Sequence, residues 1–344
     1  MKPSSRVLIG LSLAVILAGS LAFRHANRAL GSPLDVPEDG ILFEIAAGSA
    51  LTTVVEELAG QGILGNPGIF RWYAQLRGRA GSIRAGEYRI DPGTTPRDLL
   101  DKFVAGEVQL YSFTVVEGWT FREMMEALAA HPAVGHSTTF EDWPRLRDTF
   151  MSTAQHPEGL FLPETYRFPK NTTDIEILGQ AYELMQQSLR DEWAGREEGL
   201  PLATAYEALI LASIIEKETA RADERPQISG VFIRRLQKGM RLQTDPTVIY
   251  GIGESFDGNL TRRDLQTDTP YNTYTRAGLP PTPIALPGAA AINAALHPAA
   301  GKALYFVATG LGDGSHRFSE TKAQHDAAVR ELLVRQRDAR KQGQ

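Results

Sequence analysis

Residues 209–219 read LILASIIEKET, the most informative stretch of the chain. It is apolar enough to form a buried helix, and it carries two carboxylates near its end, Glu216 and Glu218. Each residue turns a helix by about 100°, so Glu218 shares a face with three aliphatic residues that Glu216 points away from: Leu211, Ile214 and Ile215. A carboxyl group in apolar surroundings is disfavoured as an anion, so its pKa rises and it can hold a proton near neutral pH. Glu218 is therefore the candidate general acid. The alternative is that both glutamates lie at the solvated edge of a core helix and have no catalytic role.

The composition is that of an ordinary globular protein, with 42% hydrophobic and 22% charged residues among 344. That length accommodates two domains. The net charge of −5 gives no reason to expect nucleic acid as a partner. The chain has no cysteine, which excludes disulfides, thiolate catalysis and thiolate zinc sites. Its histidines lack the spacing of a zinc motif, so we expect no metal and no other cofactor.

An uncharged, mostly apolar run covers residues 7–23, and basic residues flank it on both sides. Its 17 residues are at the short end for a membrane span and at the long end for a signal peptide. The short basic tail before it favours an N-terminus inside the cell. We therefore predict a cytoplasmic tail (1–6), a transmembrane helix (7–23), a linker (24–38) and a large exported body. A cleaved signal peptide is the alternative.

One pattern recurs three times in the first half of the chain, at residues 48–58, 93–103 and 118–128. In each copy a glycine is followed by apolar residues at +6, +7 and +10, and a short β-like stretch precedes the glycine. Two of the copies contain pairs with the spacing of a helix capping box, Thr95 with Asp98 and Thr120 with Glu123. The repeated unit is predicted to be a strand, a glycine turn and a capped amphipathic helix.

The second half of the chain alternates helical patterns with a long irregular region. Gly, Pro, Thr and Tyr are frequent throughout residues 241–288, which we predict to be loops, and a loop region this long is usually functional. The predicted fold class is α+β. Further helices are predicted at 174–193, 224–239, 289–296 and 321–341, and strands at 304–308 and near 317–318.

Two segments of the irregular region have the composition of a carbohydrate groove. LQTDPTVIY (242–250) and YNTY (271–274) offer hydroxyls, amides, aromatic rings and one carboxylate, with little positive charge. Aromatic faces stack on sugar rings, while amides and hydroxyls satisfy the polar edges. Good turn formers occur in both segments, so turn chemistry is the alternative. The predicted substrate-binding residues are Gln243, Asp245, Thr247, Tyr271, Asn272 and Tyr274.

These motifs resemble those of a known family, the MltG, or YceG-like, endolytic lytic transglycosylases. The resemblance covers nearly the whole chain in the expected order, including the N-terminal span and the repeats, which form a LysM-like module in that family. The second glutamate of EKE is the family's catalytic acid/base, which corresponds to Glu218 in this sequence. The position of Glu164 varies in residue type within the family. The matching segments are ASIIEKET (212–219), RLQTDPTVIYG (241–251), YNTY (271–274), GLPPTPI (278–284) and LPETY (162–166).

The resemblance implies cleavage of the β-1,4 bond between N-acetylmuramic acid and N-acetylglucosamine in peptidoglycan. Protonated Glu218 would donate its proton to the glycosidic oxygen. Its carboxylate would then take the proton of the muramic C6 hydroxyl, which attacks C1 and leaves a 1,6-anhydro end. The sugar supplies its own nucleophile, so one carboxylate suffices, unlike in ordinary glycoside hydrolases.

The resemblance also implies a biological setting and a division into domains. It implies an inner-membrane protein with a periplasmic catalytic domain that ends glycan strand elongation, with peptidoglycan synthases (penicillin-binding proteins) as protein partners. The predicted boundaries are a LysM-like module at 39–112, a third repeat or connecting segment at 113–155, a YceG-like catalytic domain at 156–338 and a tail at 339–344.

Two other functions are compatible with the same residues. A hydrolase would use Glu218 as acid with Asp245 or Glu216 as base or nucleophile, and it would release a reducing end. A non-catalytic anchor would bind peptidoglycan through the repeats and would keep full function after Glu218→Gln. We expect structural roles for His316 and His325, which flank a turn rich in Ser and Thr.

Overall fold

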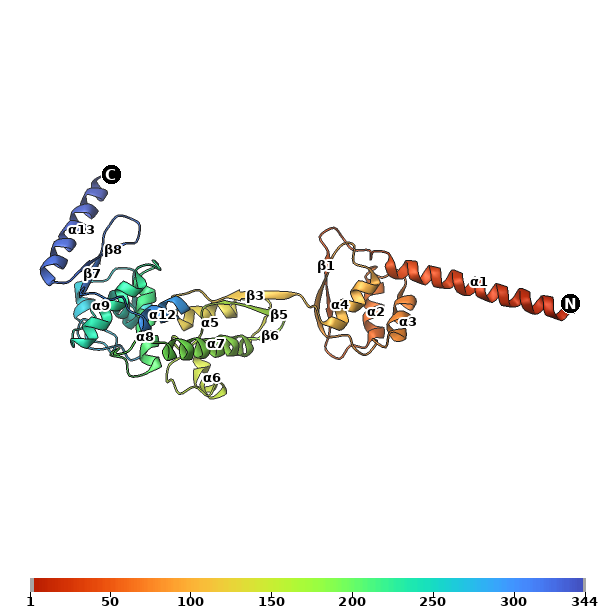
Figure 1. Ribbon diagram of the computed structural model, residues 1–344, viewed down its shortest axis with the longest axis horizontal. Coiled ribbons are helices and arrows are strands. Elements are labelled where there is room, and N and C mark those ends of the chain that lie inside the picture. The colour runs from red at the N-terminus through yellow and green to blue at the C-terminus, as the bar shows by residue number, and fades with distance from the viewer. Residues whose placement is uncertain (1–2, 343–344) are drawn as a thin grey trace. The chain divides into compact units, whose positions relative to one another are not determined.

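The computed structural model describes residues 3–342, with side chains described for residues 10–338 (Figure 1). The chain divides into two compact units. The first contains the residues up to Tyr111 together with Arg167–Asn171, and the second contains the rest. The predicted module boundary after residue 112 therefore lies one residue beyond this division.

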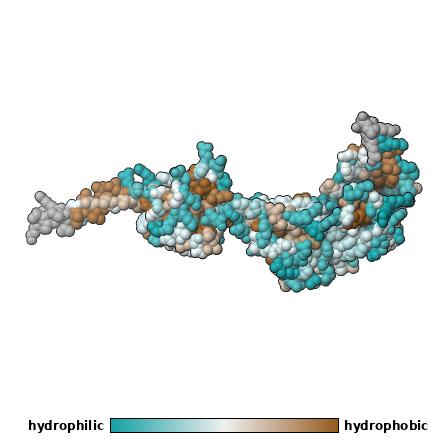
Figure 2. Space-filling view, turned by 180° about the vertical axis from the view of Figure 1, so that it is seen from behind, coloured by the Kyte–Doolittle hydropathy of each residue, from teal (hydrophilic) through white to brown (hydrophobic). Residues whose placement is uncertain are grey.

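The first helix, α1 (Pro3–Gly31), includes the apolar run of residues 7–23. The helix continues through residues 24–31, where we predicted a linker, and it ends just before Pro33, whose ring disfavours helical backbone in the preceding residue. The predicted tail at 1–6 and the start of the run lie outside the described side chains. Figure 2 shows hydrophobic residues along this helix, and Leu11, Ile16 and Phe23 are 65–71% exposed. Among the residues that the structure describes, no helix is both long and apolar enough to cross a membrane.

The first unit contains two copies of the repeat. Its two strands pair antiparallel, with Ile41 opposite Ile90 and Ile45 opposite Gly86. Three helices cover this pair, and their apolar faces form one core with the inward residues of the strands. The largest fully buried members of the core are Phe70, Tyr88 and Phe103. The elements are β1 (Ile41–Ile45), α2 (Leu51–Gly60), α3 (Pro67–Leu76), β2 (Gly86–Ile90) and α4 (Pro96–Ala105).

The predicted repeat unit is confirmed in all three copies. The third copy consists of β3 (Leu110–Thr114) and α5 (Phe121–Ala129). The repeat glycines Gly48, Gly93 and Gly118 have φ of +80°, +86° and +80°, a left-handed conformation that residues with a Cβ rarely adopt. Thr95 and Thr120 each form the predicted capping box with the acidic residue three positions later. Local sequence therefore determines strand, turn and helix start in each copy.

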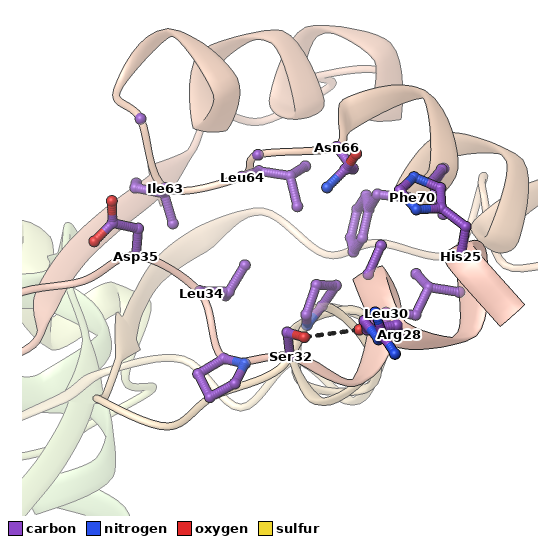
Figure 3. Close-up of a pocket in the computed structure, with 16 residues that line it drawn as sticks. His25, Arg28, Leu30, Ser32, Leu34, Asp35, Ile63, Leu64, Asn66 and Phe70 are labelled. Atoms are coloured by element: carbon purple, nitrogen blue, oxygen red, sulfur yellow. Dashed lines mark hydrogen bonds between the residues drawn. The ribbon is translucent and has the colours of Figure 1, made fainter.

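A pocket of about 370 Å³ lies within the first unit, between the C-terminal end of α1 and the segment that leads into α3 (Figure 3). His25, Arg28 and Leu30 line it from α1, and Phe70 lines it from α3. It contains one carboxylate, Asp35, and none of the predicted site residues. The chemistry therefore has to be sought in the second unit.

The second unit is predominantly helical, with short two-stranded sheets. β3 pairs with β5, β4 pairs parallel with β6, and β7 pairs antiparallel with β8. Its further elements are β4 (Val134–Gly135), η1 (Phe140–Asp142), α6 (Trp143–Thr149), β5 (Thr165–Pro169), β6 (Thr172–Thr173), α7 (Asp174–Ala194), α8 (Ala205–Glu218), α9 (Arg225–Gln237), α10 (Asp245–Ile252), η2 (Gly253–Ser255), α11 (Arg262–Gln266), α12 (Ala289–Leu296), β7 (Tyr305–Ala308), β8 (His316–Ser319) and α13 (Lys322–Gln342).

Helix α8 is the centre of this unit. Eight consecutive residues, Ala208–Ile215, are buried, because α7, α9, α10 and α12 all pack against the helix. A helix that is apolar on every side belongs in a core. Ser213 also ties it to the loop before α12, since its hydroxyl accepts a hydrogen bond from the N–H of Ile284 at 3.0 Å. Both glutamates at its end are therefore held on a rigid element.

The region 241–288 is less irregular than predicted. It contains α10 and α11 as well as loops, and Asp245 and Pro246 begin α10 instead of forming an isolated turn. A proline in the first turn of a helix loses no hydrogen bond and has the backbone angle that the helix needs. The prediction of loops throughout this region was wrong for these two segments.

Candidate active site

Glu218 is the last residue of α8. Thr219 follows it in an extended conformation (φ −148°, ψ 134°) and caps the helix by donating its N–H to the carbonyl of Ile215. The carboxyl group is thus placed at the negative end of the helix dipole, where an anion is disfavoured. Helix termination at Thr219 is what allows this side chain to leave the core of the unit.

The Glu218 carboxyl is half-buried and has one side-chain hydrogen bond among the described residues, from the Thr244 hydroxyl to Oε1. Burial raises its pKa to about 7, the Thr244 hydrogen bond lowers it, and the negative charge of Asp245 raises it again. Both protonation states are therefore present near neutral pH, which is the property a general acid/base needs. Oε2 is left for another partner.

A pocket of about 500 Å³ opens at Glu218, and it contains three of the six predicted substrate-binding residues: Gln243, Asp245 and Tyr274. Gln243 is exposed and has a left-handed backbone (φ +51°), which is strained for a residue with a Cβ. Its N–H bonds the carbonyl of Thr273 at 3.2 Å, which joins the two predicted segments. The structure thus brings Gln243 from the loop before α10, Asp245 from α10 and Tyr274 from the second segment to one cavity.

Tyr274 and Asp245 interact directly at the wall of this pocket. The Tyr274 hydroxyl donates a hydrogen bond to Oδ1 of Asp245 at 2.6 Å. Burial, followed by the neighbouring Asp245, raises the pKa of the Tyr274 phenol well above its usual range. Tyr274 is therefore a neutral hydrogen-bond donor, and Asp245 is an exposed carboxylate at the first turn of α10.

The other three predicted binding residues do not line the Glu218 pocket. Thr247 and Asn272 are fully buried. The Thr247 hydroxyl bonds the carbonyl of Thr244, and the Asn272 amide donates to three backbone carbonyls and accepts from the N–H of Tyr274. Tyr271 lines a neighbouring pocket. The structure does not support direct substrate contact for Thr247 and Asn272, which instead hold the loops in place.

Glu216 differs from Glu218 in its partners more than in its burial. Its side chain is 5% exposed, its Oε1 accepts from Arg225 at 2.9 Å, and its Oε2 accepts from the N–H of Gly288 at 3.0 Å. Glu117 adds a second carboxylate to Arg225 at 3.4 Å. The two glutamates lie on different faces of the helix, and the buried ion pair with Arg225 ties Glu216 into the fold.

Comparison with known proteins gives the same family as the sequence motifs. The YceG-like family model matches residues 43–331. The chain belongs to the YceG-like family. The prediction of the family is therefore confirmed.

The relatives of this YceG-like chain include named enzymes. A protein of Bacillus subtilis (strain 168), named endolytic murein transglycosylase, is 30% identical over 306 residues, which are 84% of each chain. One of the same name from Streptococcus pneumoniae (strain D39) is 27% identical over 320 residues, covering 83% of this chain and 57% of the relative. The predicted enzyme class, lytic transglycosylase, agrees with these names and is confirmed.

A solved structure supports the fold of the YceG-like chain. The crystal structure of the yceG-like protein lmo1499 from Listeria monocytogenes matches with a TM-score of 0.55 and 28% identity. The match covers 85% of this chain and 99% of that one.

Besides Glu216 and Glu218, the second unit contains another glutamate with a raised pKa, Glu158, which was not predicted from the sequence. Glu158 is 2% exposed, and burial raises its pKa to about 7. Its Oε1 accepts from the N–H of Phe121 and its Oε2 from the Tyr250 hydroxyl, both at 2.9 Å. It lines the neighbouring pocket of about 810 Å³, together with Tyr271. The sequence feature that could have identified Glu158 is its position directly before the apolar run 159–162.

Three further residues at the Glu218 pocket were also missed. Arg235 is buried and donates to the carbonyls of Leu242 and Leu304, each at 2.6 Å, so it fixes the strand and loop that form the wall. His316 and His325, expected to be only structural, both line the pocket. Among the described residues, no group of three or more acidic or histidine side chains is placed to hold a metal ion.

Proposed function

We propose that this protein is an endolytic lytic transglycosylase of peptidoglycan with Glu218 as its general acid/base. The observation that carries the proposal is a half-buried carboxyl with a pKa of about 7, held by Thr244 through one oxygen at the mouth of a polar pocket. The names of the relatives support the reaction class. One group that is acid and base in turn needs a pKa near the working pH.

The reaction proceeds in two proton transfers. Glu218 gives its proton to the glycosidic oxygen between N-acetylmuramic acid and N-acetylglucosamine, and the bond to C1 breaks. The muramic C6 hydroxyl then attacks C1 and transfers its proton to the Glu218 carboxylate, which yields the 1,6-anhydro end and restores the acid form of Glu218. Gln243 and Tyr274 supply an amide and a hydroxyl that bind the sugar beside Glu218, and Tyr271 contributes an aromatic ring in the adjoining pocket.

A hydrolytic muramidase is the second candidate, and one observation favours it. Asp245 is an exposed carboxylate in the Glu218 pocket, and its charge raises the Glu218 pKa. Paired carboxylates are what ordinary glycoside hydrolases use, one as acid and one as base or nucleophile. The two reactions leave different ends, a 1,6-anhydro end or a reducing end, which differ in mass by one water molecule.

We further propose that α1 anchors the protein in the inner membrane, with the second unit in the periplasm. The uncharged run at 7–23 and the exposed apolar side chains of α1 support this. The repeats of the first unit are proposed as a LysM-like glycan-binding module, and the enzyme as one that ends glycan strand elongation beside peptidoglycan synthases. Reporter fusions after residue 40 should be active only as exported proteins; a cytoplasmic readout would refute the placement.

The decisive experiment is digestion of purified sacculi by the full chain, followed by mass spectrometry of the ends. Anhydro ends that disappear in Glu218→Gln are the expected result. Reducing ends would establish the hydrolase instead. Full function of Glu218→Gln would overturn both enzymatic functions and leave the non-catalytic anchor.

A further inference from the structure

His316, the first residue of β8, lines the same pocket as Glu218. Glu224, which is 5% exposed, holds it at two points. One carboxylate oxygen accepts from the backbone N–H of His316 at 2.9 Å, and the other lies 2.7 Å from the ring atom Nδ1. Phe306 packs edge-on against the ring, with centroids 5.5 Å apart. The imidazole is therefore fixed by a buried carboxylate and an aromatic ring.

The contact with Glu224 decides which ring nitrogen is free. A carboxylate only accepts hydrogen bonds, so Nδ1 carries a proton, and in the neutral ring Nε2 carries a lone pair. The hydrogen bonds of the described residues leave Nε2 without a protein partner. An imidazole oriented in this way by a buried carboxylate is suited to take a proton from a hydroxyl.

We propose that His316 is a second catalytic residue, whose Nε2 accepts the proton of the attacking muramic C6 hydroxyl. The inference rests on the proposed function and changes one step of it. Glu218 protonates the glycosidic oxygen, which takes the electron pair of the breaking C1–O bond. The C6 oxygen forms the new bond to C1, and its proton moves to Nε2. The step ends with a Glu218 carboxylate and an imidazolium, and proton exchange with water restores both groups. Glu224 is the positioning residue.

Several other groups face this pocket and share its electrostatics. His325 differs from His316: among the described residues its Nδ1 has no hydrogen-bond partner, its ring stacks on Tyr305, and burial lowers its pKa. Arg221 approaches Glu224 at 3.8 Å. The charged or titratable residues around the pocket are Glu218 on α8, Arg235 on α9, Asp245 on α10, Tyr274, Tyr305 on β7, and Lys322 and His325 on α13.

The test is the pH dependence of glycan cleavage by the full chain and by His316→Asn. The Asn amide N–H can replace Nδ1–H toward Glu224, but nothing replaces Nε2, so the variant keeps the structural link and loses the base. We expect a fall in rate of about a hundredfold or more. The acid limb of the rate profile should disappear, because Asn has no ring nitrogen that can accept a proton. Arg317→Ala, an exposed neighbour on β8, should behave as wild type.

Glu224→Gln provides a second test of the same inference. The Gln amide oxygen still accepts from Nδ1–H, but the negative charge that stabilises an imidazolium is gone, so the acid limb should move to lower pH. A His316→Asn rate within threefold of wild type, or an acid limb unmoved by both variants, overturns the inference. If His316→Asn does not fold, the Glu224→Gln profile decides. If Glu218→Gln loses activity but His316→Asn behaves as wild type, only this inference is refuted. If Glu218→Gln keeps full activity, the proposed function is refuted.

Discussion

Glu218 and Glu158 have the same raised pKa, about 7, in two pockets of the second unit. Burial is the first cause for both. Glu158 is 2% exposed, and both of its oxygens accept hydrogen bonds, from Phe121 and Tyr250. Glu218 is half-buried, and Thr244 holds only Oε1.

A raised pKa therefore identifies a desolvated carboxyl but does not by itself identify a catalytic one. A general acid must reach the substrate oxygen with a free carboxyl oxygen. Glu158 instead ties the start of α5 to α10 through both of its carboxyl oxygens, so neither oxygen is left for a substrate. The segment 271–274 serves both pockets, since Tyr271 lines one and Tyr274 lines the other.

The largest expected effect separates the two glutamates by activity. Glu218→Gln should lower the rate of glycan cleavage by about a hundredfold or more, because general acid/base catalysis is removed. Glu158→Gln should stay within about threefold of wild type wherever it folds. The measurement is release of soluble fragments from sacculi, with thermal unfolding as the control. Comparable losses in both variants at unchanged stability would show that the free oxygen is not the deciding feature.

The pH dependence sharpens the same contrast. The acid form of Glu218 dominates below pH about 7, so the cleavage rate should fall about tenfold per pH unit above that value. The free energy of unfolding should also fall as pH rises. The pKa of Glu218 in the folded state lies above the unfolded value of 4.5, so the folded state loses stability between pH about 4.5 and 7. Rate profiles of wild type and Glu158→Gln should share the basic limb. A limb that moves in Glu158→Gln would contradict the assignment.

Asn272→Ala tests whether Asn272 binds substrate or stabilises the loop around it. A substrate-binding role, as predicted from the sequence, would mean lost turnover at unchanged stability. The buried amide and its hydrogen bonds to Asp264, Leu265 and Thr267 instead predict a loss of stability. We expect about 2 kcal/mol less free energy of unfolding, because these carbonyls are left without their donor. Asn259→Ala, an exposed control, should change it by less than about 0.5 kcal/mol. Denaturant unfolding measures both, and equal values would restore the substrate-binding role.

The smallest effect is expected for a matched pair of hydroxyl deletions. Tyr274→Phe removes the donor to Asp245 in the Glu218 pocket and should lower kcat/KM by about tenfold or less. Tyr271→Phe removes a hydroxyl that bonds Thr282 in the other pocket and should leave kcat/KM nearly unchanged. Steady-state kinetics on isolated glycan strands provides the comparison. The opposite order would place the reacting sugar in the Glu158 pocket.

Much of the architecture was already determined by local sequence. The three repeats, their glycine turns and the capping boxes of two copies were predicted correctly, because each depends on residues within about ten positions of one another. Helices α8 and α12 were predicted for the same reason, from uninterrupted apolar runs. The Glu218 prediction came from its place at the end of such a run and from the family motif.

Only the tertiary structure decided which side chains meet Glu218. Thr244, Arg235 and His316 come from a loop, from α9 and from β8, and no spacing in the sequence brings them to one pocket. The same holds for the burial of Asn272, which depends on how the 264–274 loop closes around its amide. Helical and turn patterns are encoded by neighbours along the chain, whereas a pocket and the pKa values inside it depend on packing between distant segments. Sequence thus determined which residues could do chemistry, and packing decided which of them line the same pocket.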